Sequence, residues 1–388
     1  MLRARDWWIT AAALIGAAAA FALGPWAPRM TDLMVYQAGA QALLDGVDLY
    51  TVTDPGTGLP FTYPVFAAMV FVPFAVVPDA LARVAITALT LAALLLVTAT
   101  TLRWRRPEAV APRPAAVFAV AALAVVSHPV SDTLLFGQIN VILLAMVLAD
   151  VFVVRGRGRG VLVGIAAGIK LTPGLFVLYY LVTGQRREAR NAALAGLGTL
   201  AVGFILQPGP AWDYLTRHML DPARTGNVTY AGNQSLLATT ARLLRDPLPP
   251  AWLTLGLSAV VAVTALVLAY RLDRLGHRLA AVCVVGVATL LASPIAWTHH
   301  WVWLVPCLSV YAAWAAGRTP WAWVPFGVAV LAFWTGPMRF MPKNDLRELA
   351  HNLPQQLITN SFALLALGFL AWAAYLSRMR DRAQLTVI

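Results

Sequence analysis

Residues 161–183 read VLVGIAAGIKLTPGLFVLYYLVT, an apolar stretch that Lys170 and Pro173 interrupt near its middle. Basic segments flank it on both sides, RGRGR at 155–159 and RREAR at 186–190. Short loops rich in Arg and Lys stay on the cytoplasmic side of a membrane. The stretch should therefore enter and leave the membrane on one side. We interpret it as two short helices that meet within the membrane, where broken backbone is tolerated if it lines a polar cavity.

The composition extends this interpretation to the whole chain. Hydrophobic residues make up 60% of it, charged residues 12%, and the mean hydropathy is +0.71. Soluble domains are about 45–50% apolar and about 25% charged. Apolar runs of about 17–25 residues, the length that crosses a bilayer as a helix, recur along the sequence. We predict an all-α, polytopic integral membrane protein with one membrane domain over residues 1–388.

The net charge of +12 could suggest a nucleic-acid partner, but its distribution does not. The basic residues concentrate in short segments between the apolar runs, whereas most acidic residues fall in the other loops. By the positive-inside rule we expect the basic segments and both chain termini to be cytoplasmic. These segments are 3–5, 103–113, 155–159, 186–190, 271–278, 318 and 378–382.

About ten to thirteen membrane segments are expected. Residues 63–77 are short and bounded by prolines, so we predict a re-entrant or short tilted helix there. The first apolar run is interpreted as a retained helix rather than a signal peptide, because no clear cleavage site follows it. Regular spans are predicted near 7–23, 81–102, 115–126, 139–154, 191–206, 252–270, 279–291, 301–316, 321–334 and 357–376. The long outward loops, 24–62, 207–251 and 335–356, should form the active face.

Polar residues beside membrane spans are costly, and several polar motifs gather on this outer side. In chain order they read TDLMVY at 31–36, DLY at 48–50, TYP at 62–64, FGQIN at 136–140, KLTP at 170–173, GNQS at 232–235 and SPIAWTHH at 293–300. The two cysteines, Cys283 and Cys307, both fall in apolar runs and suggest neither a disulfide framework nor a thiolate metal site.

Taken together and in this order, the motifs resemble glycosyltransferase family 87. Its members are polyprenol-phosphate-mannose-dependent α-(1→2)-mannosyltransferases of actinobacteria, and the likeness is greatest to those that extend phosphatidylinositol mannosides. The resemblance implies a C-type glycosyltransferase fold in the cytoplasmic membrane. It also implies a polyprenyl-phosphate-mannose donor, a mannosylated phosphatidylinositol-type or lipomannan-type lipid acceptor, and an extracytoplasmic active site.

By its position in the first outer loop, Asp32 corresponds to the catalytic base of that family. A carboxylate there can accept the proton of an acceptor hydroxyl as its oxygen attacks the anomeric carbon. The structural alternative is that Asp32 caps a short surface helix, since Asp is a favoured N-cap residue and residues from Leu33 onward can be helical.

The other candidate residues would bind donor phosphate or sugar. For His299 and His300 we favour such a contact over interfacial packing or a metal site, because no nearby carboxylate or thiolate completes a metal shell. We therefore predict no metal cofactor. Lys170 either neutralises the donor phosphate or extends to the cytoplasmic interface. Amides suit sugar hydroxyls or interhelical hydrogen bonds, and aromatic rings suit sugar stacking or an interfacial belt. The amides are Gln138, Asn140, Asn233 and Gln234; the aromatic residues are Tyr36, Tyr63 and Trp297.

Two other functions remain open from the sequence. A secondary transporter could use the broken helix around Lys170, although the polar residues gather at the outer face and no second broken helix pairs with it. An enzyme of the same kind could transfer arabinofuranose or glucose from another polyprenyl phosphate.

Overall fold

The computed structural model describes residues 4–385, except 26, 107 and 220. Within this part every regular element is a helix, and strand-like pairing is confined to two isolated bridges, Thr53 with Pro60 and Asn233 with Trp297. Four helices are long and apolar enough to cross a membrane, and a bent pair would make a fifth span. The four are α4 (Asp79–Trp104), α10 (Arg186–Leu206), α13 (Ala251–Arg274) and α18 (Ser361–Leu385). The all-α, polytopic prediction is confirmed.

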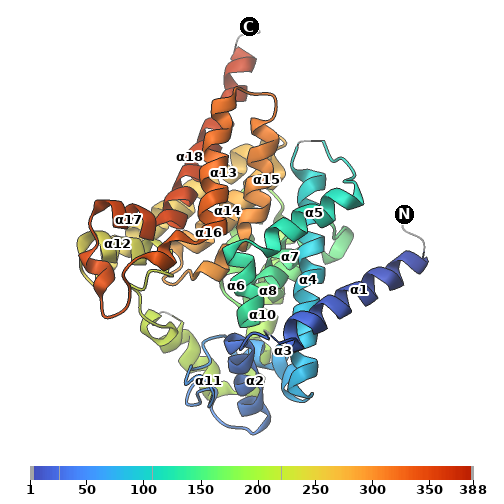
Figure 1. The fold of residues 1–388 in the computed structure, drawn as a ribbon, viewed down its shortest axis with the longest axis vertical. Coiled ribbons are helices and arrows are strands. Elements are labelled where there is room, and N and C mark those ends of the chain that lie inside the picture. Colours follow the sequence, from blue (N-terminus) through green and yellow to red (C-terminus); the bar gives the residue numbers. More distant parts are fainter. Residues whose placement is uncertain (1–3, 26, 107, 220, 386–388) are drawn as a thin grey trace.

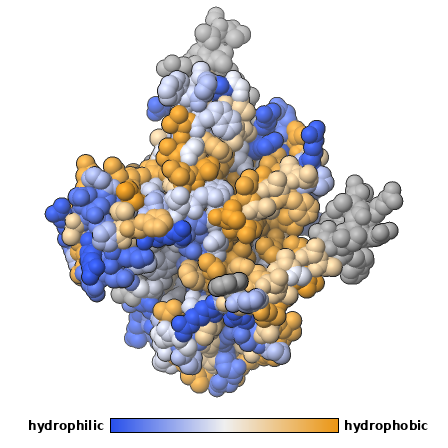
Figure 2. Space-filling model, in the orientation of Figure 1, coloured by the Kyte–Doolittle hydropathy of each residue, from blue (hydrophilic) through white to orange (hydrophobic). Residues whose placement is uncertain are grey.

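Shorter apolar helices complete the bundle, with α7, α8 and α14 in its interior (Figure 1). Apolar residues cover much of the centre and right of the face in Figure 2, while hydrophilic residues gather at its left edge, over α12 and α17. The remaining α-helices are α1 (Ala4–Leu23), α2 (Thr31–Leu44), α3 (Val65–Ala75), α5 (Pro114–Val125), α6 (His128–Phe136), α7 (Asn140–Phe152), α8 (Val161–Ile169), α9 (Leu175–Val182), α11 (Pro208–Asp213), α12 (Leu236–Leu244), α14 (Arg278–Ala292), α15 (Leu304–Ala315), α16 (Val324–Thr335) and α17 (Leu353–Thr359).

The broken helix is present where the sequence places it. Helix α8 ends at Ile169, Lys170 is extended with φ −149° and ψ 126°, and α9 begins at Leu175 after a single 3₁₀ turn at Thr172–Gly174. A buried carboxylate that the sequence analysis did not single out fixes the entry into α8. Asp150 accepts hydrogen bonds from Gly160 N at 2.6 Å, Val163 N at 3.2 Å and the Tyr180 hydroxyl at 2.5 Å.

Three of the basic segments meet in space. Arg159 and Arg278 both donate to the side-chain oxygen of Gln185, which lies just before α10, and Asn191 donates to the carbonyl oxygens of Arg157 and Arg159. In Figure 1 the α4–α5 connection lies at the upper end of the molecule, opposite α2 and α11 at the lower end. The predicted placement of the two chain ends concerns residues 1–3 and 386–388, which lie outside the described residues.

Several predicted spans differ from the observed helices. The span predicted at 115–126 ends at Val125, and α6 follows at an angle of 75°, because Pro129 lacks the N–H that would continue α5. The span predicted at 301–316 begins as a 3₁₀ segment, η5 (Thr298–Trp303), because Pro306 cannot donate to the carbonyl four residues back. The span predicted at 321–334 becomes α-helical only from Val324. The span predicted at 357–376 begins within the short α17, and its long helix starts at Ser361.

A fully buried arginine joins several loop segments in the carboxyl-terminal half. From α12, Arg242 donates to the carbonyl oxygens of Thr229, Tyr230 and Asn233 and to the side-chain oxygen of Asn360, at 2.7–3.2 Å. A buried guanidinium is stable when its donors are satisfied in this way. These bonds fix the loop that precedes α12 against the start of α18.

Candidate active site

The start of α2 is held against the end of α6. Met30, the residue before α2, is fully buried with φ 53° and ψ 51°, and its N–H donates to Leu135 O at 3.2 Å. Gly137 ends α6 with φ 67°, and a Cβ there would lie 2.9 Å from the Cβ of Leu33. The left-handed backbone and the close approach both favour glycine at this position. The packing brings Gln138, the next residue, beside Asp32.

Asp32 belongs to a network of four polar side chains. Gln138 Nε2 donates to Asp32 Oδ1 at 2.7 Å, and the Tyr36 hydroxyl donates to Gln138 Oε1 at 2.7 Å. The Tyr63 hydroxyl lies 3.3 Å from that of Tyr36 and 3.4 Å from Gln138 Nε2. Among the described residues no hydrogen bond reaches Asp32 Oδ2. One carboxylate oxygen is therefore oriented by the protein, and the other has the capacity to accept a substrate proton.

The capping alternative for Asp32 is not observed. The N-cap of α2 is Met30, without a side-chain hydrogen bond, and Asp32 lies in the first turn with its carboxylate on Gln138. Burial raises the pKa of Asp32 from 3.8 to about 6, against the opposing effects of the Gln138 hydrogen bond and the Lys170 charge. Burial also raises the pKa of Tyr63 to about 12, so its hydroxyl stays protonated at neutral pH.

The raised pKa of Asp32 predicts how activity depends on pH. A base has to be ionised to accept a proton, so kcat/KM should rise through a pKa of about 6 and level off above it. Below that value, kcat/KM should fall about tenfold per pH unit. Initial rates at pH 4.5–8 test this. The residual activity of Asp32→Asn should show no such acidic limb, and an unchanged limb in that variant would assign the titration to another group.

Lys170 lies at the centre of a second group of polar residues. Its Nζ is 3.0 Å from Asn140 Oδ1, 2.9 Å from His300 Nε2 and 5.6 Å from the centre of the Tyr63 ring. Lys170 also acts electrostatically on Asp32. The half-buried lysine is thus directed toward the Asp32 network by its neighbours, whereas the alternative interpretation had it extending to the cytoplasmic interface.

His299 and His300 have different surroundings although they are adjacent. Their ring centres are 4.7 Å apart and the ring planes cross at 82°. His300 faces Lys170, whereas His299 packs edge-on against Phe136 with ring centres 5.4 Å apart. Within the described residues, His299 Nε2 is buried and has no hydrogen-bond partner. A buried polar atom without a partner is uncommon and calls for a ligand or a water.

Asn233 and Gln234 belong to the scaffold around Arg242. Asn233 Nδ2 donates to Val228 O and Pro294 O, while its Oδ1 accepts from Ser235 N and Ala296 N. Gln234 Nε2 donates to Ala231 O and Thr359 O, and its Oε1 accepts from Phe362 N. Both side chains are completely buried. The structural alternative, internal hydrogen bonding, therefore fits these two amides better than sugar binding.

The half-buried Trp297 lies close to Tyr230, with ring centres 6.0 Å apart, and Gly226 packs against its ring.

The sequence motifs do not include Asp132 and His128, which lie on α6. Asp132 Oδ2 accepts from the Thr298 hydroxyl at 2.8 Å and lies 3.5 Å from His128 Nε2. The signal was available in the sequence, because two polar residues four apart share one face of a helix directly before FGQIN.

A protein site for a metal ion usually groups at least three His, Cys, Asp or Glu side chains. Among the described residues, no three His, Cys, Asp or Glu side chains are grouped so that they could hold an ion.

A cavity of about 30 Å³ lies against Lys170, Asn140 and His300, and it has room for about one or two waters. A sugar phosphate can enter there only if neighbouring side chains move.

Comparison with known proteins places this site in context. The sequence profile of glycosyltransferase family 87 matches residues 61–294. A polyprenol-phosphate-mannose-dependent alpha-(1-2)-phosphatidylinositol mannoside mannosyltransferase of Mycobacterium tuberculosis is 35% identical, over 98% of this chain and 92% of the relative. Its counterpart from Mycolicibacterium smegmatis is 36% identical, over 91% and 85%. A polyprenol-phosphate-mannose-dependent alpha-(1-2)-phosphatidylinositol pentamannoside mannosyltransferase from that organism is 34% identical, over 74% and 70%.

No solved structure matches at a significant level. The helical membrane fold and these relatives define the protein as a membrane glycosyltransferase. The chain belongs to glycosyltransferase family 87. Membership in this family removes the secondary-transporter interpretation.

Proposed function

We propose that the protein transfers mannose from polyprenyl-phosphate mannose to a hydroxyl of a mannosylated phosphatidylinositol-type lipid, forming an α-(1→2) linkage with inversion. The activities for which the relatives are named support the donor, the linkage and the acceptor class. The observation that carries the proposal is the placement of Asp32. Gln138 orients its carboxylate, and the charge of Lys170 lowers the pKa of that carboxylate.

The chemistry follows from these two charges. The donor phosphate binds at Lys170, and the anomeric carbon lies between Lys170 and Asp32. The acceptor hydroxyl gives its proton to Asp32 as its oxygen bonds to the anomeric carbon, and the bond from that carbon to the phosphate oxygen breaks. The polyprenyl phosphate leaves with the bonding electron pair, and Lys170 neutralises its charge. Attack opposite the leaving group inverts the anomeric configuration, so a β-linked donor gives an α-linked product.

The remaining site residues orient the substrates in this proposal. Asn140 and His300 hold Lys170, and Tyr36 and Tyr63 hold Gln138. The unpartnered His299 Nε2 is suited to a sugar hydroxyl or a phosphate oxygen. Trp297 offers a ring for stacking.

Sugar choice is tested by donor competition. Purified protein should transfer mannose from polyprenyl-phosphate mannose, and the glucosyl and arabinofuranosyl donors should give much lower initial rates with the same phosphatidylinositol mannoside. Preferred transfer of arabinofuranose or glucose would keep the enzyme class and replace the sugar.

We further propose that the active face is extracytoplasmic, which predicts a labelling pattern. Asn227 and Arg187 are both exposed, and the native cysteines are both buried. In intact cells, a membrane-impermeant thiol reagent should modify Asn227→Cys but not Arg187→Cys, and permeabilised cells should expose both. Labelling of the Arg187 variant alone in intact cells would place the active face in the cytoplasm.

Metal independence is the next expectation. A monophosphate donor can be held by Lys170 and neutral polar groups, without an ion to bridge a pyrophosphate. EDTA should change the initial rate of mannosyl transfer by less than about twofold, since no metal has to polarise the leaving group. Loss of activity in EDTA and its recovery with Mg²⁺ or Mn²⁺ would reject this expectation.

A further inference from the structure

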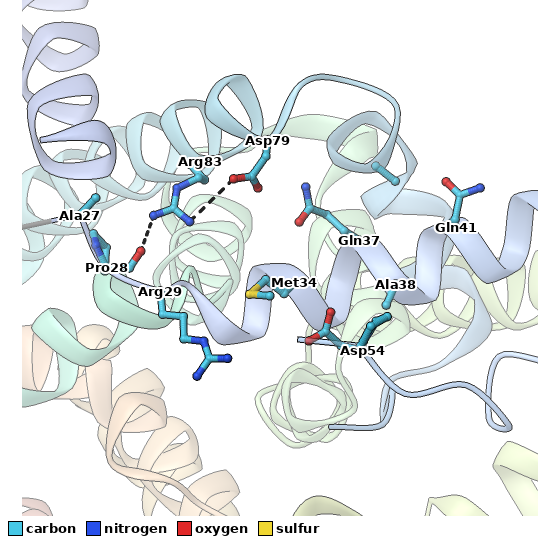
Figure 3. Close-up of a pocket in the computed structure, with 12 residues that line it drawn as sticks. Ala27, Pro28, Arg29, Met34, Gln37, Ala38, Gln41, Asp54, Asp79 and Arg83 are labelled. Atoms are coloured by element: carbon cyan, nitrogen blue, oxygen red, sulfur yellow. Dashed lines mark hydrogen bonds and ion pairs between the residues drawn. The ribbon is translucent and has the colours of Figure 1, made fainter. Parts of the chain in front are cut away.

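A large cavity lies on the face of α2 opposite Asp32. Its volume is about 740 Å³, within the roughly 300–1,000 Å³ range of small-molecule sites. Met34, Gln37, Ala38 and Gln41 line it from α2, and further lining residues come from the ends of α3 and α4 and from the segments at 27–29 and 54–55. Figure 3 shows the Gln37 carboxamide directed into the space between α2 and α4.

Half of the residues that line the cavity are polar: two glutamines, two aspartates and two arginines. Gln37 Nε2 donates to Phe74 O and Gln41 Nε2 donates to Asp45 Oδ1, so each amide retains a carbonyl oxygen for another donor. The carboxylates of Asp54 and Asp79 also line the space. Acceptors and carboxylates suit a ligand with many hydroxyl donors and disfavour one that is only an anion.

The two arginines of the cavity differ. Arg83 lies 3.9 Å from Asp79 and donates to Pro28 O and Ala22 O, so its charge and donors serve the structure (Figure 3). Arg29 is exposed and donates through one nitrogen to Gly56 O at 2.6 Å. Its other N–H groups can meet a phosphate at the rim.

The surroundings of the cavity indicate an amphiphilic ligand. Leu23, Val76 and Leu81 are 50%, 63% and 53% exposed. Along the chain, each is separated from a residue that lines the cavity by no more than about one helical turn of residues. Exposed apolar side chains at the ends of α1 and α3 and the start of α4 are suited to lipid chains. This arrangement is compatible with a headgroup in the cavity that carries acyl chains.

We propose that this cavity receives the polyhydroxylated headgroup of the acceptor lipid, on the opposite face of α2 from Asp32. The proposal rests on the proposed function, because it identifies the ligand as the acceptor. A helix with its side chains is about 10–12 Å across, so the acceptor hydroxyl reaches Asp32 only by passing around α2. The acceptor therefore has to carry a short oligosaccharide between its lipid part and the reacting hydroxyl.

The test compares three substitutions on α2. Ala38→Trp places a bulky ring in the cavity, Gln41→Leu removes a polar group from an exposed position, and Leu44→Trp is the control because Leu44 is exposed and does not line the cavity. KM is measured for a phosphatidylinositol mannoside and for polyprenyl-phosphate mannose. Ala38→Trp should raise the acceptor KM at least about tenfold by steric exclusion. Gln41→Leu should raise it about threefold to tenfold, the value of one hydrogen bond. The donor KM should not change.

Binding without turnover separates this proposal from the proposed function. In the Asp32→Asn background, native mass spectrometry should show the phosphatidylinositol mannoside bound. Adding Ala38→Trp should weaken this binding, and phosphatidylcholine should bind less than the mannoside. Such binding by a protein whose wild type transfers no mannose would reject the proposed function and keep the headgroup site. The headgroup proposal is rejected if Ala38→Trp and Gln41→Leu match Leu44→Trp in acceptor KM and binding, or if donor and acceptor KM rise together. Binding of plain phosphatidylinositol as tight as that of the mannoside would assign the cavity to a bulk lipid instead of the acceptor.

Discussion

Asp32→Asn is expected to lower turnover by about 10²–10⁴-fold, the usual contribution of a general base. The acceptor hydroxyl has a pKa far above neutrality, so it attacks slowly unless a carboxylate takes its proton. The amide that replaces the carboxylate keeps its size and can still accept a hydrogen bond from Gln138 Nε2, so the local packing should survive. Single-turnover rates at saturating donor and acceptor measure the loss, and donor binding should be largely retained.

Asp45→Asn is the matched control for this substitution. Asp45 is exposed at the end of the same helix and accepts only a local hydrogen bond from Gln41. Asp48 and Asp54 are less suitable because their carboxylates fix the loop, through Tyr50 N and through Thr57. Near-wild-type turnover in folded Asp32→Asn, together with an inactive Asp48→Asn, would show that the base had been misassigned.

Lys170→Met should lower kcat/KM for the donor by about 10²–10³-fold, the effect of removing one group that stabilises developing negative charge. Methionine keeps the length of the side chain and removes its cation. Because the Lys170 charge lowers the pKa of Asp32, the acidic limb of the pH profile should also move above about 6 in this variant. A shifted limb with an unchanged donor kcat/KM on the pH plateau would leave Lys170 with an effect on Asp32 and no role at the donor.

The chain has one other lysine, and it provides the control. Lys343 donates to Arg339 O at 3.2 Å in the loop between α16 and α17, away from the α8–α9 break. Lys343→Met should leave the donor kcat/KM and the pH profile unchanged. Equal losses in the two variants would remove Lys170 from the donor site.

The broken helix could be predicted from the sequence because its causes are local. Two basic flanks predict that both ends lie on one side, and Lys170-Leu171-Thr172-Pro173 interrupts the apolar helix. The bend between α5 and α6 has an equally local cause in Pro129, but the apolar run that precedes it looked like an ordinary span. Hydropathy alone gives the class of the fold and misplaces individual boundaries.

The pairing within the site could not be predicted, because it joins distant parts of the chain. Gln138 lies 106 residues from its partner Asp32, and His300 lies 130 residues from Lys170. For the same reason the sequence could not separate Gln138, which reaches the carboxylate, from Gln234, whose bonds all go to backbone groups. Both are amides in polar motifs beside apolar runs, and only the packing around them gives them different tasks.

The linkage formed by the wild-type protein tests the central claim most directly. Purified protein is incubated with β-linked polyprenyl-phosphate mannose and a short phosphatidylinositol mannoside, and the product is analysed by NMR. One added mannose in α-(1→2) linkage, formed by the wild type and nearly absent with Asp32→Asn, is the predicted result. A β-linked product would contradict the single inverting displacement, and a product formed equally by both proteins would contradict the role of Asp32.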